Sequence, residues 1–334
     1  MEIIIIPVLF LISVIGTLGY KKISVINQVL ARPNHRTLHK YSIPIGGGIV
    51  FSILSILSIF FVWWKYLLSE ELLWVLGAGG LFSSLFGFLD DIIDIKASIK
   101  FVVQVLLSCW TVYWLDVYEL LLFEWLPAYF SIPLVIFLLV WMINGYNFMD
   151  GVDGMAASGA IFVSLTIALV MFLTVCNAEI IYVFIFLATT VSGFIIFNWP
   201  PASIFMGDSG SAFLGYIFGS LILFTVMSGD ISIWTWLIVF GYFFADTTVT
   251  QIMRLILVKK WYLPHRSHAY QNLARISGSH LKVTGGVVLY NVVWILPLTI
   301  WSVMKPEMAL FAVVLAIAPS LVFAFKYGPL LSSS

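Results

Sequence analysis

The chain has 334 residues, of which 62% are hydrophobic and 10% are charged. Its mean hydropathy of +1.08 excludes a soluble globular domain and indicates a multi-pass membrane protein. The formal net charge is zero, and we expect no nucleic acid among its partners. The two cysteines, Cys109 and Cys176, lie in or beside apolar runs and are expected to be small core residues, not a disulfide.

Apolar runs long enough to cross a bilayer, about 20 residues each, predict eleven spanning helices. The run 231–258 is long and contains Asp246 and Arg254, so we expect it to be tilted, broken or extended beyond the membrane. Asp246 is expected either to pair with Arg254 or to help order the last loop. We predict an all-α polytopic membrane protein in which residues 1–334 form one integral membrane domain. The approximate spans are 2–20, 45–66, 71–89, 99–116, 129–146, 155–175, 179–197, 210–228, 231–258, 283–303 and 307–325.

The basic residues predict how the chain is oriented. With the N-terminus outside, Lys65 and Lys305 are the only two of the 16 lysines and arginines that fall on the outer side. The C-terminus is then cytoplasmic, and all five histidines face inward. The aspartates at inner helix ends are Asp90, Asp91, Asp94, Asp150, Asp153, Asp208 and Asp246. We therefore predict a cytoplasmic site built from five inner loops.

The first inner loop, residues 21–44, is basic and is followed by three glycines, Gly46 to Gly48. A generic basic loop held by anionic lipid headgroups would also be basic, but it would need no histidines. We expect its basic residues, Lys40 among them, to serve an anionic lipid substrate. The glycines could cradle a phosphate or permit close packing at the start of the next helix.

The second inner motif is Asp90-Asp-Ile-Ile-Asp94. Adjacent carboxylates repel one another unless a cation or a proton intervenes. Such a pair can bind Mg²⁺ and a diphosphate, or abstract a proton. A solvated cluster at a helix end, neutralised by the following Lys96 and Lys100, is the structural alternative.

The third motif runs from Asn144 to Met155 and contains two amides, two carboxylates and three glycines. The three-residue spacing places Asn144, Asn147 and Asp150 on adjoining turns of one helix face. Its polar residues could instead tie together a broken helix end.

The fourth motif, residues 198–211, contains Pro200-Pro201 and then Gly207-Asp208-Ser209-Gly210. The prolines end one helix, and Asp208 stands where the N-cap of the next belongs. A helix N-terminus also favours phosphate oxygens.

The fifth motif lies in the 259–282 loop and contains His265-Arg-Ser-His268. A zinc site is not expected, because the inner loops contain no cysteine to complete a ligand set. Contact of these side chains with phosphate is the better interpretation. His280 is expected to be a solvated loop histidine.

Together these motifs resemble the polyprenyl-phosphate N-acetylhexosamine-1-phosphate transferase family, glycosyltransferase family 4. This family includes the phospho-MurNAc-pentapeptide translocase, the enterobacterial undecaprenyl-phosphate GlcNAc-1-phosphate transferase and the eukaryotic dolichol-phosphate enzyme. The resemblance covers nearly the whole chain, and its motifs are specific as a set.

The resemblance implies a Mg²⁺-dependent enzyme, in which Mn²⁺ could substitute, with Asp208 and Asn147 as the metal ligands. Asp90 and Asp91 correspond to a pair assigned to base catalysis or to handling of metal and phosphate. Asp150 corresponds to an aspartate of the catalytic pocket whose role is unsettled.

The resemblance also implies the residues that bind the two substrates. Asn198, Phe205 and Asp153 correspond to residues around the uracil and nucleoside. The 265–268 loop corresponds to a catalytic loop at the phosphate and sugar. The expected substrate-binding set is Asn198, Phe205, Asp153, Gly207 and Lys40, and the catalytic residues of the last loop are His265, Arg266 and His268.

Two departures argue against the peptidoglycan translocase, which has Lys at the position of Asp94 and three consecutive histidines in the last loop. Eleven helices and the His265-to-Gln271 sequence are more similar to transferases that start O-antigen synthesis, with a GlcNAc, FucNAc or QuiNAc donor. The resemblance implies undecaprenyl phosphate, a UDP-N-acetylhexosamine and membrane lipids as partners, in the bacterial inner membrane. It also allows a homodimer.

Two other functions were weighed. An ion-coupled secondary transporter would place ionisable groups near mid-helix and relate its halves by a repeat, which this chain does not show. A membrane prenyltransferase would use aspartate-rich motifs but would not need the Gly207–Gly210 and His265–His268 segments.

Overall fold

The computed structural model of the chain describes residues 2–31, 42–66, 68–117, 128–175, 177–257 and 267–329. Three of the predicted site residues, Lys40, His265 and Arg266, lie outside these ranges, as does Cys176. The described part of the chain is almost entirely helical, which confirms the all-α prediction. Its short strands, β1 (Leu30–Ala31) and β2 (Ile43–Pro44), pair antiparallel on either side of the first inner loop.

Within the described ranges, ten helices, or helix pairs in line, are long and apolar enough to cross a membrane, and the number is eleven if two helices bent at 78° count as one span. That bent pair is α10 (Ile233–Val239) and α11 (Gly241–Leu257), so of the three alternatives predicted for the run 231–258, the structure shows a break. The first half of the chain contains α1 (Glu2–Ile26), α2 (Gly48–Tyr66), α3 (Glu70–Leu72), the π-helical η1 (Leu73–Gly79), α4 (Gly80–Ile93), α5 (Ala97–Trp114), α6 (Ala128–Met149) and α7 (Met155–Thr174). The second half contains α8 (Ala178–Asn198), α9 (Asp208–Met227), α10, α11, α12 (Ala269–Ser277), α13 (His280–Tyr290), η3 (Asn291–Ile295), α14 (Leu296–Met304), η4 (Pro306–Met308) and α15 (Ala309–Tyr327).

Several helices extend further toward the polar motifs than the apolar runs predicted. The helix predicted to end at 89 continues to Ile93, and the one predicted to end at 146 continues to Met149. Asp90 and Asn147 therefore lie on the last turns of helices and not in loops. Hydropathy locates the end of an apolar surface, whereas a helix can continue where its polar side chains find partners.

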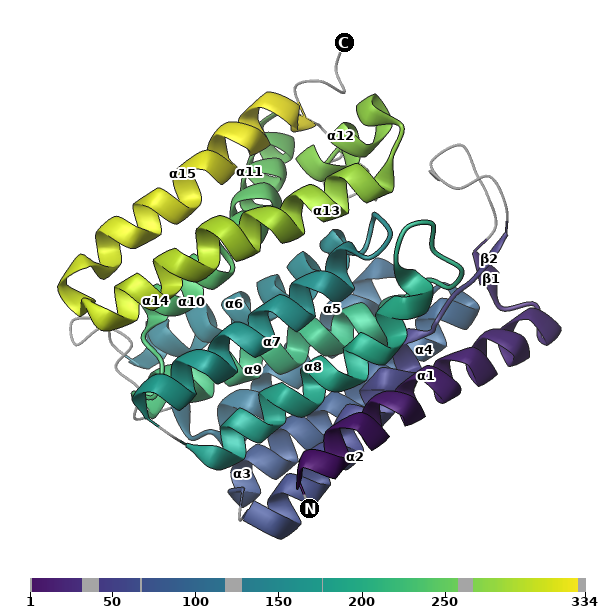
Figure 1. Cartoon of the computed structure of the whole chain (residues 1–334), viewed down its shortest axis with the longest axis horizontal. Coiled ribbons are helices and arrows are strands. Elements are labelled where there is room, and N and C mark those ends of the chain that lie inside the picture. The colour runs from purple at the N-terminus through teal and green to yellow at the C-terminus, as the bar shows by residue number, and fades with distance from the viewer. Residues whose placement is uncertain are drawn as a thin grey trace.

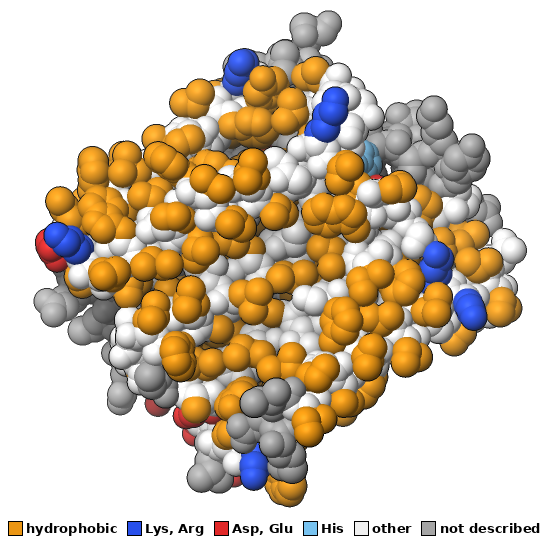
Figure 2. Space-filling view, viewed as in Figure 1, with side chains coloured by type: hydrophobic (Ala, Val, Ile, Leu, Met, Phe, Trp, Pro, Cys, Tyr) orange, Lys and Arg blue, Asp and Glu red, His pale blue; other side chains and the backbone are white. Residues whose placement is uncertain are grey.

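The helices form a bundle with α9 near its centre (Figure 1). Among the described spans, α9 is the most buried, and it packs against α4 and α6. Hydrophobic side chains cover the face of the molecule shown in Figure 2, and its charged side chains gather at the edges. This distribution is that of a multi-pass membrane protein.

The glycines after the first inner loop are used for close packing. A Cβ on Gly48 would overlap the Cα of Gly210 at the start of α9. The N–H of Gly47 donates to the carbonyl of Phe205 at 3.0 Å, and that of Gly48 donates to the carbonyl of Met206 at 2.8 Å. Of the two interpretations of the triple glycine, the packing one is confirmed.

Replacing Gly48 by Ala tests this packing. Because the obstructing atom belongs to the backbone of α9, we expect Gly48→Ala to lower the free energy of unfolding by about 1–3 kcal/mol. Gly285→Ala is the matched control, since a Cβ on Gly285 in α13 meets nothing within 4 Å. Thermal unfolding of the purified variants, followed by tryptophan fluorescence, measures both. Equal melting temperatures for Gly48→Ala and wild type would contradict the packing.

Candidate active site

The centre of the candidate site is an ion pair between three helices. The Lys100 ammonium group on α5 contacts the Asp90 carboxylate on α4, and it lies 3.2 Å from Oδ2 of Asp208 at the start of α9. The Asp90 side chain is 8% exposed, whereas those of Lys100 and Asp208 are each 29% exposed. Two carboxylates 118 residues apart in the chain therefore share the Lys100 ammonium group at one end of the bundle.

Asn147, on the last turn of α6, completes this cluster. Its Nδ2 donates to Oδ1 of Asp208 at 2.7 Å and to the Ser211 hydroxyl at 3.0 Å. One turn earlier, Asn144 and Gln104 of α5 exchange amide hydrogen bonds of 2.7 and 3.2 Å. Asn147 thus faces the carboxylates, while Asn144 joins α6 to α5.

Asp91 lies beside this cluster but has a different set of partners. Its Oδ1 accepts the Asp208 N–H at 2.8 Å, and its Oδ2 accepts the Ser209 N–H at 3.1 Å. The next two N–H groups of α9, those of Gly210 and Ser211, donate to the Gly207 carbonyl. Asp91 therefore caps α9 from another helix.

This arrangement corrects one expectation about α9, because Asp208 is the first residue of the helix and not its side-chain cap. The first four N–H groups of α9 have acceptors within the protein, so a phosphate oxygen at this N-terminus would have to replace one of them. Two features require glycine at position 207. Its φ of +74° is one that L side chains rarely adopt, and a Cβ would overlap the Asp91 carboxylate.

Asp150 begins the turn after α6 and is partly buried. Burial raises the pKa of its carboxyl group well above the usual range, and the negative charges of Asp208 and Asp91 raise it further. The Gly207 backbone N–H acts in the opposite direction. The protonated form of Asp150 is therefore favoured when no further cation is near.

Asp153 and Asn198, the predicted nucleoside contacts, join two backbone segments. Oδ2 of Asp153 accepts the Ala202 N–H at 3.0 Å, and its Oδ1 lies 3.0 Å from Nδ1 of His280. Oδ1 of Asn198 accepts the Gly154 N–H at 3.1 Å, while its Nδ2 donates to the Ile204 carbonyl at 3.0 Å. The turn after α6 and the 199–207 loop are thus held side by side. Phe205, whose N–H donates to the Pro44 carbonyl at 2.8 Å, connects that loop to β2.

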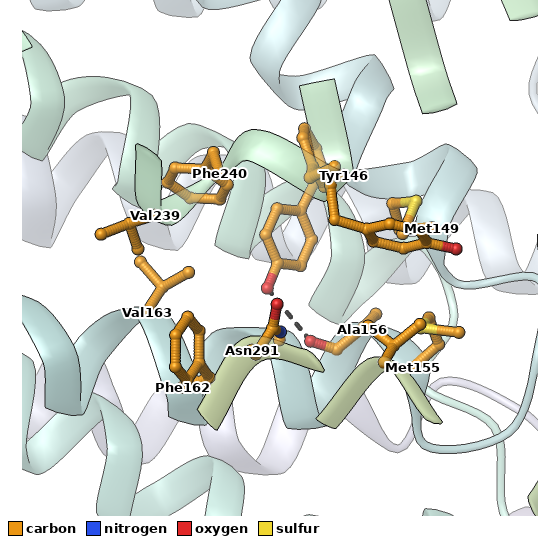
Figure 3. A pocket seen from close by; sticks show the side chains of 13 residues that line it. Tyr146, Met149, Met155, Ala156, Phe162, Val163, Val239, Phe240 and Asn291 are labelled. Carbon is orange, nitrogen blue, oxygen red and sulfur yellow. Dashed lines mark hydrogen bonds between the residues drawn. The ribbon is translucent and has the colours of Figure 1, made fainter. Parts of the chain in front are cut away.

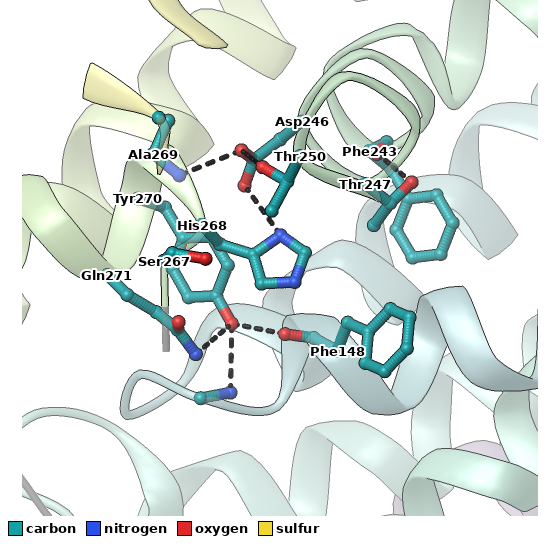
Figure 4. A network of polar contacts seen from close by, with 12 residues as sticks. Phe148, Phe243, Asp246, Thr247, Thr250, Ser267, His268, Ala269, Tyr270 and Gln271 are labelled. Carbon is teal, nitrogen blue, oxygen red and sulfur yellow. Dashed lines mark hydrogen bonds and ion pairs between the residues drawn. The ribbon is translucent and has the colours of Figure 1, made fainter. Parts of the chain in front are cut away.

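His268 precedes α12 and is 2% exposed (Figure 4). Its Nδ1 lies 3.7 Å from Oδ2 of Asp246, and its ring packs on Phe148 at 5.5 Å between centroids. Asp246 accepts the Ala269 N–H at 2.8 Å, so it contacts the last loop, which was one of its two predicted roles. The predicted contact of His268 with substrate stays a prediction.

Two cavities lie near these residues and are lined by described residues. One of about 30 Å³ is lined by Asp90, Lys100 and Asp208 at one end and by apolar groups such as Val103 and Leu107 at the other. The second, of about 40 Å³, lies between α6–α7 and α10–η3 and is lined mainly by apolar and aromatic side chains, including Phe162 and Phe240 (Figure 3). The first cavity therefore joins the charged cluster to an apolar region, whereas the second has no charged lining.

The donor atoms of the cluster suit a hard divalent cation. Asp90 and Asp208 already share the Lys100 ammonium group, and the Asn147 amide, if turned over, would present an oxygen beside Asp208. Within the described ranges, no group of three His, Cys, Asp or Glu side chains is arranged to hold a metal. Mg²⁺ often takes one or two carboxylates and fills its other positions with water and phosphate, so the residues present fit it.

The structure brings together most of the predicted residues that it describes. Asp90, Asp91, Asn147, Asp150 and Asp208 come from three helix ends, those of α4, α6 and α9, and meet at one place. Sequence reasoning named Lys100 only as a lysine that could neutralise the Asp90-to-Asp94 motif, and it missed the contact of Lys100 with Asp208. It also missed Gln104 as the partner of Asn144, and it expected His280 to be a solvated loop residue, whereas His280 contacts Asp153. The available signal for Lys100 was its short spacing from Asp90, which lies at the end of one helix while Lys100 lies in the first turn of the next.

Comparison with known proteins agrees with this site. Residues 73–226, which include Asp90, Asn147 and Asp208, match the family described as glycosyl transferase family 4. The chain is similar to this family over those residues, which carry most of the described site.

Relatives of two kinds are similar to the chain. It is 27% identical to a "probable undecaprenyl-phosphate N-acetylglucosaminyl 1-phosphate transferase" of Bacillus subtilis, over 78% of this chain and 74% of the relative. It is 28% identical to an "undecaprenyl-phosphate alpha-N-acetylglucosaminyl 1-phosphate transferase" of Thermotoga maritima, over 80% of this chain and 79% of the relative. It is 31% identical to a "phospho-N-acetylmuramoyl-pentapeptide-transferase" of Wolbachia pipientis, over 60% of this chain and 66% of the relative, just under two thirds.

Replacing Asp150 by Asn tests its protonation. A carboxyl group whose folded-state pKa is raised stabilises the fold less as the pH rises above its ordinary pKa of about 4. Without divalent cations, we therefore expect Asp150→Asn to raise the melting temperature by about 2–4 °C at pH 8, with a smaller effect at pH 5. Glu307→Gln, at an exposed outer turn, is the control and should show no such trend. A lower melting temperature for Asp150→Asn at every pH would refute the raised pKa.

Proposed function

We propose that the protein transfers an N-acetylhexosamine 1-phosphate from a UDP-sugar to undecaprenyl phosphate, giving undecaprenyl-diphosphate-sugar and UMP. The observation that supports this most strongly is the meeting of Asp90, Lys100, Asn147 and Asp208 beside a cavity that Asp90, Lys100 and Asp208 line together with apolar side chains. A cluster of this kind suits phosphate groups and a cation next to the apolar helices. Two of the three relatives described above have names that point to the same reaction.

The chemistry needs no covalent bond to the protein. An oxygen of the lipid phosphate attacks the phosphorus that bears the sugar, and the bond from that phosphorus to the bridging oxygen breaks, so UMP leaves. The second pKa of a phosphate monoester is near 6, and the acceptor is therefore largely dianionic at neutral pH. A strong base is not required, and the task of the protein is to hold two anions together.

The side chains divide this task. Mg²⁺, when bound by Asp208 and Asn147, supplies a Lewis acid that neutralises diphosphate charge, and Mn²⁺ suits the same donors. Lys100 carries a fixed positive charge next to the position of the phosphates, held there by Asp90. A protonated Asp150 adds no negative charge and can donate a hydrogen bond to a phosphate oxygen. Arg266 and His265 of the last loop are proposed to contact the phosphates as well.

The finer assignments are part of this proposal. The distribution of the basic residues along the chain supports a site at the cytoplasmic face of a bacterial inner membrane, with a cytoplasmic C-terminus. The His265-to-Gln271 sequence supports a transferase that initiates O-antigen or another cell-envelope polysaccharide, with GlcNAc or a 6-deoxy N-acetylhexosamine as the sugar. Asp94 in place of Lys supports this branch over the pentapeptide translocase.

The test of the proposal is release of UMP by the purified protein with Mg²⁺, undecaprenyl phosphate and a panel of UDP-N-acetylhexosamines. We expect one of these donors to give UMP and a lipid-linked sugar diphosphate, and UDP-MurNAc-pentapeptide to give neither. UMP from the pentapeptide donor alone would establish the translocase instead. Absence of UMP with every donor would refute the transferase, and ion-coupled uptake of substrate in vesicles would then support the transporter.

Replacing Asp208 by Asn gives a second test. The variant has nearly the same shape but one acceptor oxygen in place of two, so it can keep the contact with Lys100 or the one with Asn147, and it loses the charge that attracts a cation. We expect turnover to fall by about 100-fold or more, with membrane insertion and melting temperature close to those of wild type. Asp230→Asn, in the turn after α9 at the opposite end of the bundle, is the matched control. Near-normal activity of Asp208→Asn would contradict its proposed metal role.

A further inference from the structure

A second polar network, drawn in Figure 4, consists of residues other than Asp90, Lys100 and Asp208. Its centre is Asp246 on α11, which is fully buried. Oδ1 of Asp246 accepts the N–H of Ala269, the first residue of α12, at 2.8 Å, and Thr250 donates to the same oxygen at 3.4 Å. Burying a carboxylate costs free energy unless the group accepts hydrogen bonds. The contacts with Ala269 and Thr250 therefore fix where Asp246 lies.

The residue after Ala269 carries the network to the site. Tyr270 is fully buried, and its hydroxyl donates to the Phe148 carbonyl and accepts the Gly151 N–H at 3.2 Å. Nε2 of Gln271 donates to the same hydroxyl at 3.1 Å. Phe148 and Gly151 stand on either side of Asp150 in the chain. One phenol group therefore holds the backbone of the turn that carries Asp150.

These contacts form one continuous connection, from Asp246 through Ala269 and Tyr270 to the turn at 148–151. His268 lies within it, with its ring between Asp246 and Phe148 in Figure 4. Among the described residues, His280 and Thr284 also join the C-terminal helices to the chain just after this turn, through the backbone of Asp153. The Tyr270 hydroxyl is the group that contacts the backbone on both sides of Asp150.

We infer that Asp246 is a positioning residue of the transfer reaction, acting through Ala269 and Tyr270 on the turn that carries Asp150; this inference rests on the proposed function. Asp246 itself does not contact the substrates. Its hydrogen bond with the Ala269 N–H holds the end of the last loop against α11. The turn at 148–151 is thereby kept in the geometry that the reaction needs. A displacement of about 1 Å in such a support can lower a rate by about 100-fold.

Three variants of the full chain separate the links of this connection. Asp246→Ala removes the acceptor for the Ala269 N–H, whereas Asp246→Asn keeps an oxygen at the same place without its charge. Tyr270→Phe removes the hydroxyl contacts to Phe148 and Gly151 but leaves the α12 cap intact. Thr299→Val is the matched control, because Thr299 is fully buried and, among the contacts described, its hydroxyl donates only to the Ile295 carbonyl of the same span.

Hydrogen–deuterium exchange measures the connection without any turnover. In Asp246→Ala we expect exchange to rise by about tenfold or more in peptides covering both 147–155 and 267–277. In Tyr270→Phe we expect the rise in 147–155 alone. Asp246→Asn and Thr299→Val should resemble wild type in both peptides. Unchanged exchange of 147–155 in both Asp246→Ala and Tyr270→Phe would overturn the inference.

Steady-state kinetics then test the consequence for the reaction. We expect kcat to fall by about 10- to 100-fold in Asp246→Ala and in Tyr270→Phe, with the KM for undecaprenyl phosphate within about twofold of wild type, and Asp246→Asn to recover most of the loss. A loss confined to KM, or an equal loss in Thr299→Val, would overturn the positioning role. If Asp246→Ala does not fold, Tyr270→Phe decides. If wild type releases no UMP, the proposed function fails, while the exchange data still decide the connection.

Discussion

The structure depends on how a membrane protein accommodates four carboxylates at one end of its bundle. Asp90, Asp91, Asp150 and Asp208 converge there, and unpaired charges of one sign would repel one another strongly in a partly buried site. The four are accommodated in three ways. Asp90 and Asp208 share the Lys100 ammonium group, Asp91 accepts two N–H groups of α9, and burial beside the other carboxylates raises the pKa of Asp150. The partly exposed carboxylate of Asp208 is the basis of the cation site that we propose.

The same cluster explains the close packing of the helices around α9. Asp91 can reach the first N–H groups of α9 only because α4 approaches α9 without a side chain between them: a Cβ on Gly87 would overlap the Asp208 carbonyl. Gly48 gives α2 a similarly close approach at Gly210. The small residues near the site are therefore needed for its electrostatics as well as for its packing, since the capping distance and the helix spacing are set together.

The sequence predicted the helical class, the broken span and most of the residues that meet in the site. These features follow from local signals: apolar length, a charge within an apolar run, and polar residues concentrated at one set of helix ends. The partners of those residues could not be predicted, because they depend on which helices are neighbours. Asp90 and Asp91 are adjacent and identical in sequence, yet one faces Lys100 and the other caps α9. A one-residue step turns a helical side chain by about 100°, and only the packing of α4 on α9 and α5 decides which carboxylate meets which partner.

The motif residues can now be sorted by what they contact. Asp91, Asp153 and Asn198 have backbone N–H groups as partners, so their first role is to hold the α9 terminus, the 199–207 loop and the turn after α6 in register. Asp90, Asn147 and Asp208 contact one another or Lys100, and the two carboxylates line the cavity. Asp90 belongs in part to both groups, because its Oδ1 also accepts the Ile95 N–H at 2.7 Å. Substitutions in the two groups differ physically: loss of a backbone acceptor leaves a buried N–H without its partner, whereas loss of a cluster carboxylate relieves repulsion. The first group should therefore be limited by stability and the second by chemistry, although both lie within the same short motifs.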